Sequence, residues 1–68
     1  MKLTVNGEGL EIPGDLTLLA LLSQLNVALE RVAVELNLSV IDKNQFDQVV
    51  LKDNDKIEII NFVGGGGG

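Results

Sequence analysis

The chain contains no cysteine and no histidine. Without cysteine there is neither a disulfide nor a thiolate nucleophile, and without histidine the common Ser/His and Cys/His catalytic pairs cannot form. Any metal would have to be held by oxygen ligands alone, which disfavours zinc and copper. We therefore expect a protein that is not itself an enzyme and that has no metal site of its own.

Aromatic residues are almost missing as well, because the sequence has two phenylalanines and neither tryptophan nor tyrosine. Hydrophobic residues nonetheless make up 46% of the 68 positions, so leucine, isoleucine and valine must provide nearly all of the buried surface. At this length a single domain is expected, and disorder is not expected before the terminal glycines.

Long hydrophobic runs are also absent. The longest is the five-residue run Leu18–Leu22, whereas about 20 apolar residues are needed to span a bilayer. The first residues alternate like a strand and show no signal-peptide hydrophobic region, so we expect a cytoplasmic protein without a membrane segment. The net charge of −5 disfavours nucleic acid and anionic lipid and favours a partner with a basic surface.

The first third of the chain predicts a hairpin followed by a helix. Apolar and polar residues alternate over 2–6 and again over 10–12, with turn residues 6–9 between them. Thr17 stands where a helix N-cap belongs. The period then changes to that of a helix of about two and a half turns. Its apolar stripe consists of Leu18, Leu21, Leu22 and Leu25.

The remainder of the chain predicts short strands separated by turns. The segments with a strand pattern are 32–36 with a short continuation at 40–41, then 49–51, then a last strand with Ile57 and Ile59 pointing inward. The turn segments are 37–39, 42–47 and 53–55. We expect 42–47 to form a turn or a single helical turn that places Phe46 at the end of the core.

These elements predict an α+β domain in which four to five strands form a mixed sheet with one main helix across one face. If the first and last strands lie parallel in the middle of the sheet, the arrangement is a β-grasp, or ubiquitin-like, fold. Other small α+β arrangements fit the same periodicities. We assign this domain to residues 1–63 and a flexible C-terminal glycine tail to residues 64–68.

Two short motifs carry little functional information. The run Gly7-Glu8-Gly9 lacks the third glycine of a dinucleotide fingerprint and is not followed by a helix, so we interpret it as a hairpin turn. The run Asp53-Asn54-Asp55 lacks the spaced ligands and the distant glutamate of a calcium loop, so a solvated turn is the better interpretation.

Three apolar side chains exceed what the core needs. Leu19 lies off the helical stripe, and Ile60 and Phe62 should point opposite to Ile57 and Ile59 because side chains alternate along a strand. Either sheet curvature or the edge of the helix buries these side chains, or they form an exposed patch at which a partner docks. The position of Ile60 and Phe62 next to the glycines makes the docking hypothesis worth testing.

The five terminal residues, Gly64, Gly65, Gly66, Gly67 and Gly68, have no side chains. Such a thread can enter a channel too narrow for other residues and, at roughly 3.3 Å per residue, can carry its carboxylate up to about 17 Å. Ordering it opposes binding by on the order of 1 to 2 kcal/mol per residue, so docking of the folded domain has to offset this loss. The alternative is an inert linker or a remnant of a tag.

The sequence resembles the ThiS-type sulfur carrier proteins of thiamin biosynthesis, which are ubiquitin-like β-grasp domains. The resemblance covers the whole chain and rests on the stretches MKLTVNGE, LTLLALLSQL, VAVELNLSVI and LKDNDKIEIINFVGGG. The AVELN segment and the residues that lead into the first glycines are the most specific parts.

The resemblance implies a mechanism carried by the C-terminus. A ThiF-like adenylyltransferase, using ATP and Mg²⁺, would convert the terminal carboxylate to an acyl-adenylate, and a persulfide sulfur would displace AMP. The resulting thiocarboxylate would deliver its sulfur to a ThiG-like thiazole synthase. The reactive position maps to Gly68, preceded by Gly67, with Gly64 to Gly66 as the thread. Many relatives have two or three glycines, so the resemblance leaves open which glycine is activated.

Other functions fit the same features. The small subunit of molybdopterin synthase is a similar carrier, although it is usually longer and tends to have prolines before its glycines. Sulfur carriers of other pathways share the β-grasp fold and differ in their partners. From a different class, a ubiquitin-like modifier would join Gly68 to lysines of target proteins, and an ordinary binding module would have inert glycines.

Overall fold

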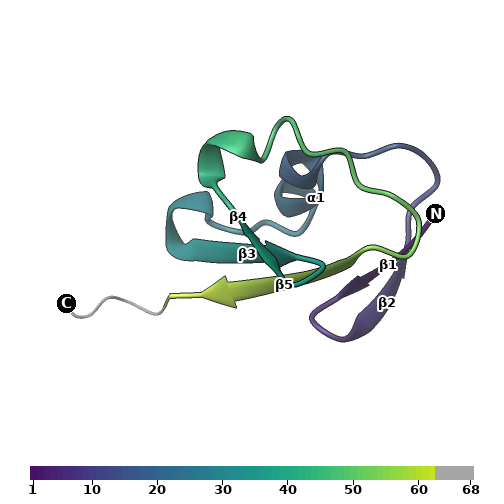
Figure 1. The fold of residues 1–68 in the computed structure, drawn as a ribbon, viewed down its shortest axis with the longest axis horizontal. Helices are drawn as coiled ribbons and strands as arrows, with labels where there is room; N and C mark the ends of the chain where they lie inside the picture. Colours follow the sequence, from purple (N-terminus) through teal and green to yellow (C-terminus); the bar gives the residue numbers. More distant parts are fainter. Residues whose placement is uncertain (63–68) are drawn as a thin grey trace.

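The computed structural model describes residues 1–62. These residues form a five-stranded sheet in the order β2-β1-β5-β3-β4 with one α-helix over one of its faces (Figure 1). The strands are β1 (Lys2–Val5), β2 (Glu8–Glu11), β3 (Val32–Leu36), β4 (Ser39–Ile41) and β5 (Lys56–Asn61). The helices are α1 (Leu18–Gln24) and the short 3₁₀ turns η1 (Leu29–Arg31) and η2 (Lys43–Gln45).

The first and last strands lie side by side and parallel near the middle of the sheet. Thr4 is opposite Lys56, and Val5 is opposite Ile57. All other neighbouring strands are antiparallel, so the sheet is mixed. The sequence left open whether the first and last strands pair in parallel in the middle of the sheet. Their parallel pairing confirms the β-grasp arrangement.

Both hairpins of the sheet turn through residues with positive φ. The β1–β2 turn uses Asn6 and Gly7, and the β3–β4 turn uses Asn37 and Leu38. Two consecutive positive φ angles match the right-handed twist of the flanking strands. The sequence predicted 40–41 as a continuation of the preceding strand, but the second turn reverses the chain completely, so β4 is a separate antiparallel edge strand.

Helix α1 begins as the sequence predicts and ends earlier. The Oγ1 atom of Thr17 accepts a hydrogen bond from the Ala20 N–H at 3.1 Å, which confirms the N-cap. At the other end Asn26 adopts a φ of 58°, and its N–H bonds to Ser23 O. The next N–H, that of Val27, bonds to Leu22 O, which completes a Schellman motif.

Because of this C-terminal cap, the apolar stripe of the helix is shorter than predicted. Leu18, Leu21 and Leu22 are fully buried, whereas Leu25 is the C-cap residue and is 39% exposed. The helix therefore covers only part of the sheet.

The segment between β4 and β5 runs along the same face of the sheet as α1 (Figure 1). The short turn η2 lies within the predicted segment 42–47, and Phe46 after it is only 2% exposed, as the sequence indicated. The predicted strand at 49–51 is wrong, because this segment meets the loop before α1 and not the sheet. It makes a single isolated bridge between Val50 and Thr17.

The core is aliphatic apart from Phe46. Its buried members are Leu3, Ile12, Leu18, Leu21, Leu22, Val32, Val34, Phe46, Leu51 and Ile57. Within residues 1–62, no buried side-chain nitrogen or oxygen lacks a hydrogen-bond partner. No helix in this part of the chain is long and apolar enough to cross a membrane.

Candidate functional site: the two faces of the last strand

The face of the sheet opposite α1 carries exposed apolar side chains. Along β5, Ile57 is fully buried and Ile59 is half-buried on the helix side, whereas Ile60 is 47% exposed. Phe62 continues the alternation and is 55% exposed. The sequence alone did not decide whether Ile60 and Phe62 are buried, and the structure shows that both are exposed.

These residues belong to a larger group on the same face, which we call the open-face patch and define as Ala33, Val40, Ile60 and Phe62. Ala33 lies directly opposite Ile60 in the β3–β5 pairing. Val40 points to the same face from the edge strand β4 and is 71% exposed. The patch thus spans β4, β3 and β5, beside the point where the chain leaves the sheet.

The end of β5 is held by the backbone up to the last described residue. The Phe62 N–H donates to the carbonyl of Arg31 at 2.7 Å, which continues the antiparallel pairing with β3 past Asn61. The aromatic side chain of Phe62 is therefore exposed on a fixed strand. The predicted tail residues Gly64, Gly65, Gly66, Gly67 and Gly68 lie outside the described residues, as does the domain boundary at residue 63.

Leu19 does not join the open-face patch. It is part of α1, on the other side of the sheet, and is partly buried against the core. Its N–H donates to the carbonyl of Phe46 at 2.9 Å. The structure therefore brings together two of the three predicted docking residues and separates the third from them.

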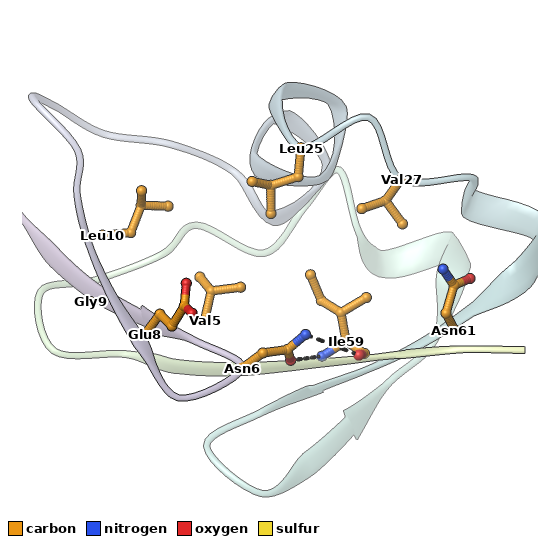
Figure 2. Close-up of a pocket in the computed structure, with 9 residues that line it drawn as sticks. All are labelled: Val5, Asn6, Glu8, Gly9, Leu10, Leu25, Val27, Ile59 and Asn61. Atoms are coloured by element: carbon orange, nitrogen blue, oxygen red, sulfur yellow. Dashed lines mark hydrogen bonds between the residues drawn. The ribbon is translucent and has the colours of Figure 1, made fainter.

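A groove of about 510 Å³ lies on the helix side of β5, between the β1–β2 hairpin and the end of α1 (Figure 2). Five aliphatic side chains line it, namely Val5, Leu10, Leu25, Val27 and Ile59, with Asn6, Glu8, Gly9 and Asn61 completing the lining. Sequence reasoning missed this groove. The signal that could have found it is Asn26, whose tendency to adopt positive φ ends α1 before the helix covers this part of the sheet.

The described residues offer apolar surfaces rather than a cluster of metal ligands. Within residues 1–62, no group of three or more aspartate, glutamate, cysteine or histidine side chains is placed to hold a metal ion. The groove and the open-face patch lie on opposite sides of the same strand, so the end of β5 has a hydrophobic surface on either side.

The central parallel strand pair and the single covering helix define the chain as a β-grasp domain, and its sequence places five glycines after the last strand. The model of the ThiS family matches residues 3–66. The chain belongs to the ThiS family.

Two solved structures of one relative agree with this assignment. The crystal structure of the thiamine biosynthesis protein ThiS from Geobacter metallireducens is 45% identical, with a TM-score of 0.83, covering 97% of this chain and 100% of that chain. The solution structure of a thiamine biosynthesis protein from the same organism has a TM-score of 0.80 at 45% identity and covers 97% and 88% of the two chains.

Curated proteins of two kinds are also similar. The thiazole synthase of Paramagnetospirillum magneticum is 46% identical over 66 residues, which are 97% of this chain and 20% of that protein. The chain thus spans about a fifth of the length of the thiazole synthases it matches. The uncharacterized protein ycf40 of Porphyra purpurea is 36% identical over 97% of this chain and 93% of its own length.

Proposed function

We propose that this chain is a sulfur carrier protein of thiamin biosynthesis whose terminal glycine carboxylate is adenylated and then converted to a thiocarboxylate. The observation that carries the proposal is the extent of the family match, which runs through residues 3–66. The match includes the first three glycines, so these belong to the family pattern. This supports a functional terminus over an inert linker.

The chemistry follows from the weakness of a carboxylate as an electrophile. One of its oxygens attacks the α-phosphorus of ATP and releases pyrophosphate, and the resulting acyl-adenylate has AMP as a leaving group. A persulfide sulfur then displaces AMP from the carbonyl carbon. Cleavage of the remaining sulfur–sulfur bond by a second thiol leaves the thiocarboxylate on the carrier.

The carrier supplies the reacting group, and its partners supply catalysis. We assign adenylation to a ThiF-like adenylyltransferase that uses ATP and Mg²⁺, and a protein persulfide as the sulfur source. We place the reactive carboxylate on Gly68, preceded by Gly67, with Gly64 to Gly66 as the thread. Because ATP is an intracellular co-substrate, we place the reaction in the cytoplasm.

A thiazole synthase is the proposed acceptor of the sulfur. The support is that a segment 46% identical to this chain makes up about a fifth of a protein named thiazole synthase. A domain that is covalently joined to such a protein in one organism is a natural partner of a separate one in another. The small-subunit-like and modifier functions lack a comparable observation.

Docking of the domain has to offset the entropy that the glycine thread loses on binding. The open-face patch suits this role because Ile60 and Phe62 are exposed and the backbone of Phe62 is held by β3. Leu19, on the other side of the sheet, would contact a partner only if that partner also reached over the helix.

Intact mass spectrometry tests the proposal. The chain is incubated with ATP, a persulfide donor and the adenylyltransferase of the same organism, and a variant that ends at Val63 is the matched control. We expect the full chain to gain the mass difference between one sulfur and one oxygen and the control to gain nothing. No gain with an active enzyme, or stable conjugates to other proteins, would contradict the carrier function.

A further inference from the structure

Two carboxylates face each other in the middle of the open face of the sheet. Glu35 on β3 and Glu58 on β5 are directly opposite in the strand register. Their neighbours Val34 and Ile57 are fully buried on the core face. Since successive side chains of a strand point to opposite faces, Glu35 and Glu58 point away from the core. Directly opposed side chains have Cβ atoms about 4.5 to 5.5 Å apart, and like charges at this position are destabilising. The free domain therefore places two like charges side by side.

Apolar side chains flank the two carboxylates on the β4 side and on the side towards the tail. Val40 is directly opposite Glu35 on its other side, in the β3–β4 pairing. The next pair on the same face, towards the tail, is Ala33 with Ile60. The two glutamates thus adjoin the open-face patch, and a partner that covers Val40 and Ile60 together must also cover them.

No side-chain hydrogen bond within residues 1–62 compensates these carboxylates. The side-chain hydrogen bonds found in residues 1–62 involve asparagines, aspartates and Thr17, and neither Glu35 nor Glu58 takes part in them. The nearest base along β5 is Lys56, which is two residues from Glu58 on the same face, at about 7 Å along the strand. If a partner covered the pair without supplying a cation, two unpaired charges would be buried in an apolar contact.

We propose that the open face docks on a partner surface that inserts an arginine between Glu35 and Glu58, with apolar groups around it that cover Val40 and Ile60. The inference rests on the proposed function, because it takes this partner to be the adenylating enzyme that receives the tail. It adds the chemistry by which the partner is recognised.

Arginine fits this place better than lysine. Its planar guanidinium presents several N–H donors in a fixed fork and can serve two neighbouring carboxylates at once. Once the interface forms, the apolar side chains beside the pair would exclude water on two sides, which would strengthen the contact relative to an ion pair at the rim. The net charge of −5 additionally favours encounter with a basic surface.

Other occupants of the open face fit less well. A second copy of the chain, bound through the same face by a twofold axis that passes near the pair, would place Glu35 and Glu58 against the same two residues of the partner copy. A nucleic acid would bring phosphates to a pair of carboxylates. Both arrangements add repulsion where the arginine removes it.

The test measures binding of the full-length chain to the adenylyltransferase of the same organism by titration calorimetry. The variants are Glu35→Gln and Glu58→Gln, singly and together. The matched control is Glu11→Gln, which makes the same change of charge on β2, opposite Lys2 and away from the patch. We expect each single variant to raise Kd by about tenfold or more. The control should keep Kd within about twofold of the wild-type value. The double variant should bind more weakly than either single variant. Its fold-increase in Kd should nevertheless be smaller than the product of the two single increases, because both carboxylates share one cation.

Thermal unfolding of the same variants separates binding from folding. Removal of one of two opposed charges should keep or raise Tm, so weaker binding cannot be attributed to misfolding. Unchanged Kd in both single variants would overturn the proposal, and so would a dimer of the wild-type chain that dissociates when Glu35 and Glu58 are replaced by lysine.

The sulfur-gain experiment keeps this inference separate from the proposed function. If the wild-type chain gains sulfur and the glutamine variants bind like wild type, the inference fails and the carrier function stands. If the wild-type chain binds through Glu35 and Glu58 without gaining sulfur, the inference stands and the carrier function fails. If the wild-type chain neither binds nor reacts, both are wrong.

Discussion

The side-chain amide of Asn6 hydrogen-bonds to both backbone groups of Ile59 (Figure 2). Its Oδ1 accepts from the Ile59 N–H at 2.7 Å, and its Nδ2 donates to the Ile59 carbonyl at 3.3 Å. Strand β1 ends at Val5, so the amide takes the place of the next strand residue and extends the contact between β1 and β5. It thereby fixes the backbone of β5 immediately before Ile60.

Replacement of Asn6 tests this contact. Asn6→Gly removes the amide but tolerates the φ of 50° at this position, so the turn itself stays accessible. We expect the free energy of unfolding to fall by about 1 to 2 kcal/mol, because two backbone groups lose their partner. Asn6→Asp keeps the acceptor and loses the donor, so its free energy of unfolding should lie between those of Asn6→Gly and wild type. Urea unfolding of the three proteins decides, and equal stability of Asn6→Gly and wild type would contradict the role of the amide.

The β3–β4 turn is strained at Leu38. This residue has a φ of 74° and is 83% exposed, so its side chain contributes almost no burial to offset the strain. A left-handed conformation costs a non-glycine residue roughly 1 to 2 kcal/mol, and glycine in turn loses about 0.5 to 1 kcal/mol of chain entropy. We expect Leu38→Gly to raise the free energy of unfolding by about 0.5 to 1 kcal/mol.

Leu38→Ala is the matched control for this prediction. Alanine meets the same backbone restriction as leucine, so its stability should stay close to that of wild type. Chemical denaturation of both variants measures the difference. If the glycine variant is no more stable than the alanine variant, the positive φ of Leu38 carries no measurable strain.

The elements that depend on local sequence were predictable. The Thr17 cap, the alternation of β3 and the burial of Phe46 follow from hydrogen-bonding groups and apolar spacing within a few residues. The segment 49–51 was mispredicted as a strand because its apolar pattern reflects packing on the loop before α1. The end of α1 was also misplaced, because the signal is the conformation of Asn26 and not the apolar period.

The candidate site could be predicted only in part. Alternation along β5 correctly predicts that Ile60 and Phe62 lie on the face opposite Ile57. Whether they are exposed depends on whether a second layer covers that face, which the alternation does not specify. The opposition of Glu35 and Glu58 depends on the register of two strands more than 20 positions apart, which no local pattern specifies. Non-local pairing is therefore the part of the site that required a structure.

The N-cap of α1 should contribute measurably to stability. Thr17→Ala removes the acceptor of the Ala20 N–H and should lower the free energy of unfolding by about 1 kcal/mol. Thr17→Ser retains the hydroxyl and should recover most of this loss. Because Thr17 lies on the helix side of the sheet, neither variant should alter the rate of adenylation per folded molecule. A slower rate at full folding would imply that the start of α1 also contacts the partner.

The two phenylalanines of the chain form a matched pair for the docking hypothesis. Phe62 is 55% exposed on the open face, whereas Phe46 is 2% exposed in the core. Phe46→Ala should lower the free energy of unfolding by about 3 to 5 kcal/mol and leave the turnover of the remaining folded molecules unchanged. Phe62→Ala should change stability by no more than about 0.5 kcal/mol.

The same Phe62→Ala variant should lower kcat/KM for adenylation severalfold, because the open-face patch loses its largest side chain next to the tail. Steady-state pyrophosphate release with the adenylyltransferase, together with urea unfolding, measures both quantities on each variant. The two substitutions remove the same atoms, so the difference between them reports only where the ring lies. If Phe62→Ala loses stability as Phe46→Ala does while its folded fraction reacts normally, Phe62 is a packing residue and docking must rely on the rest of the patch.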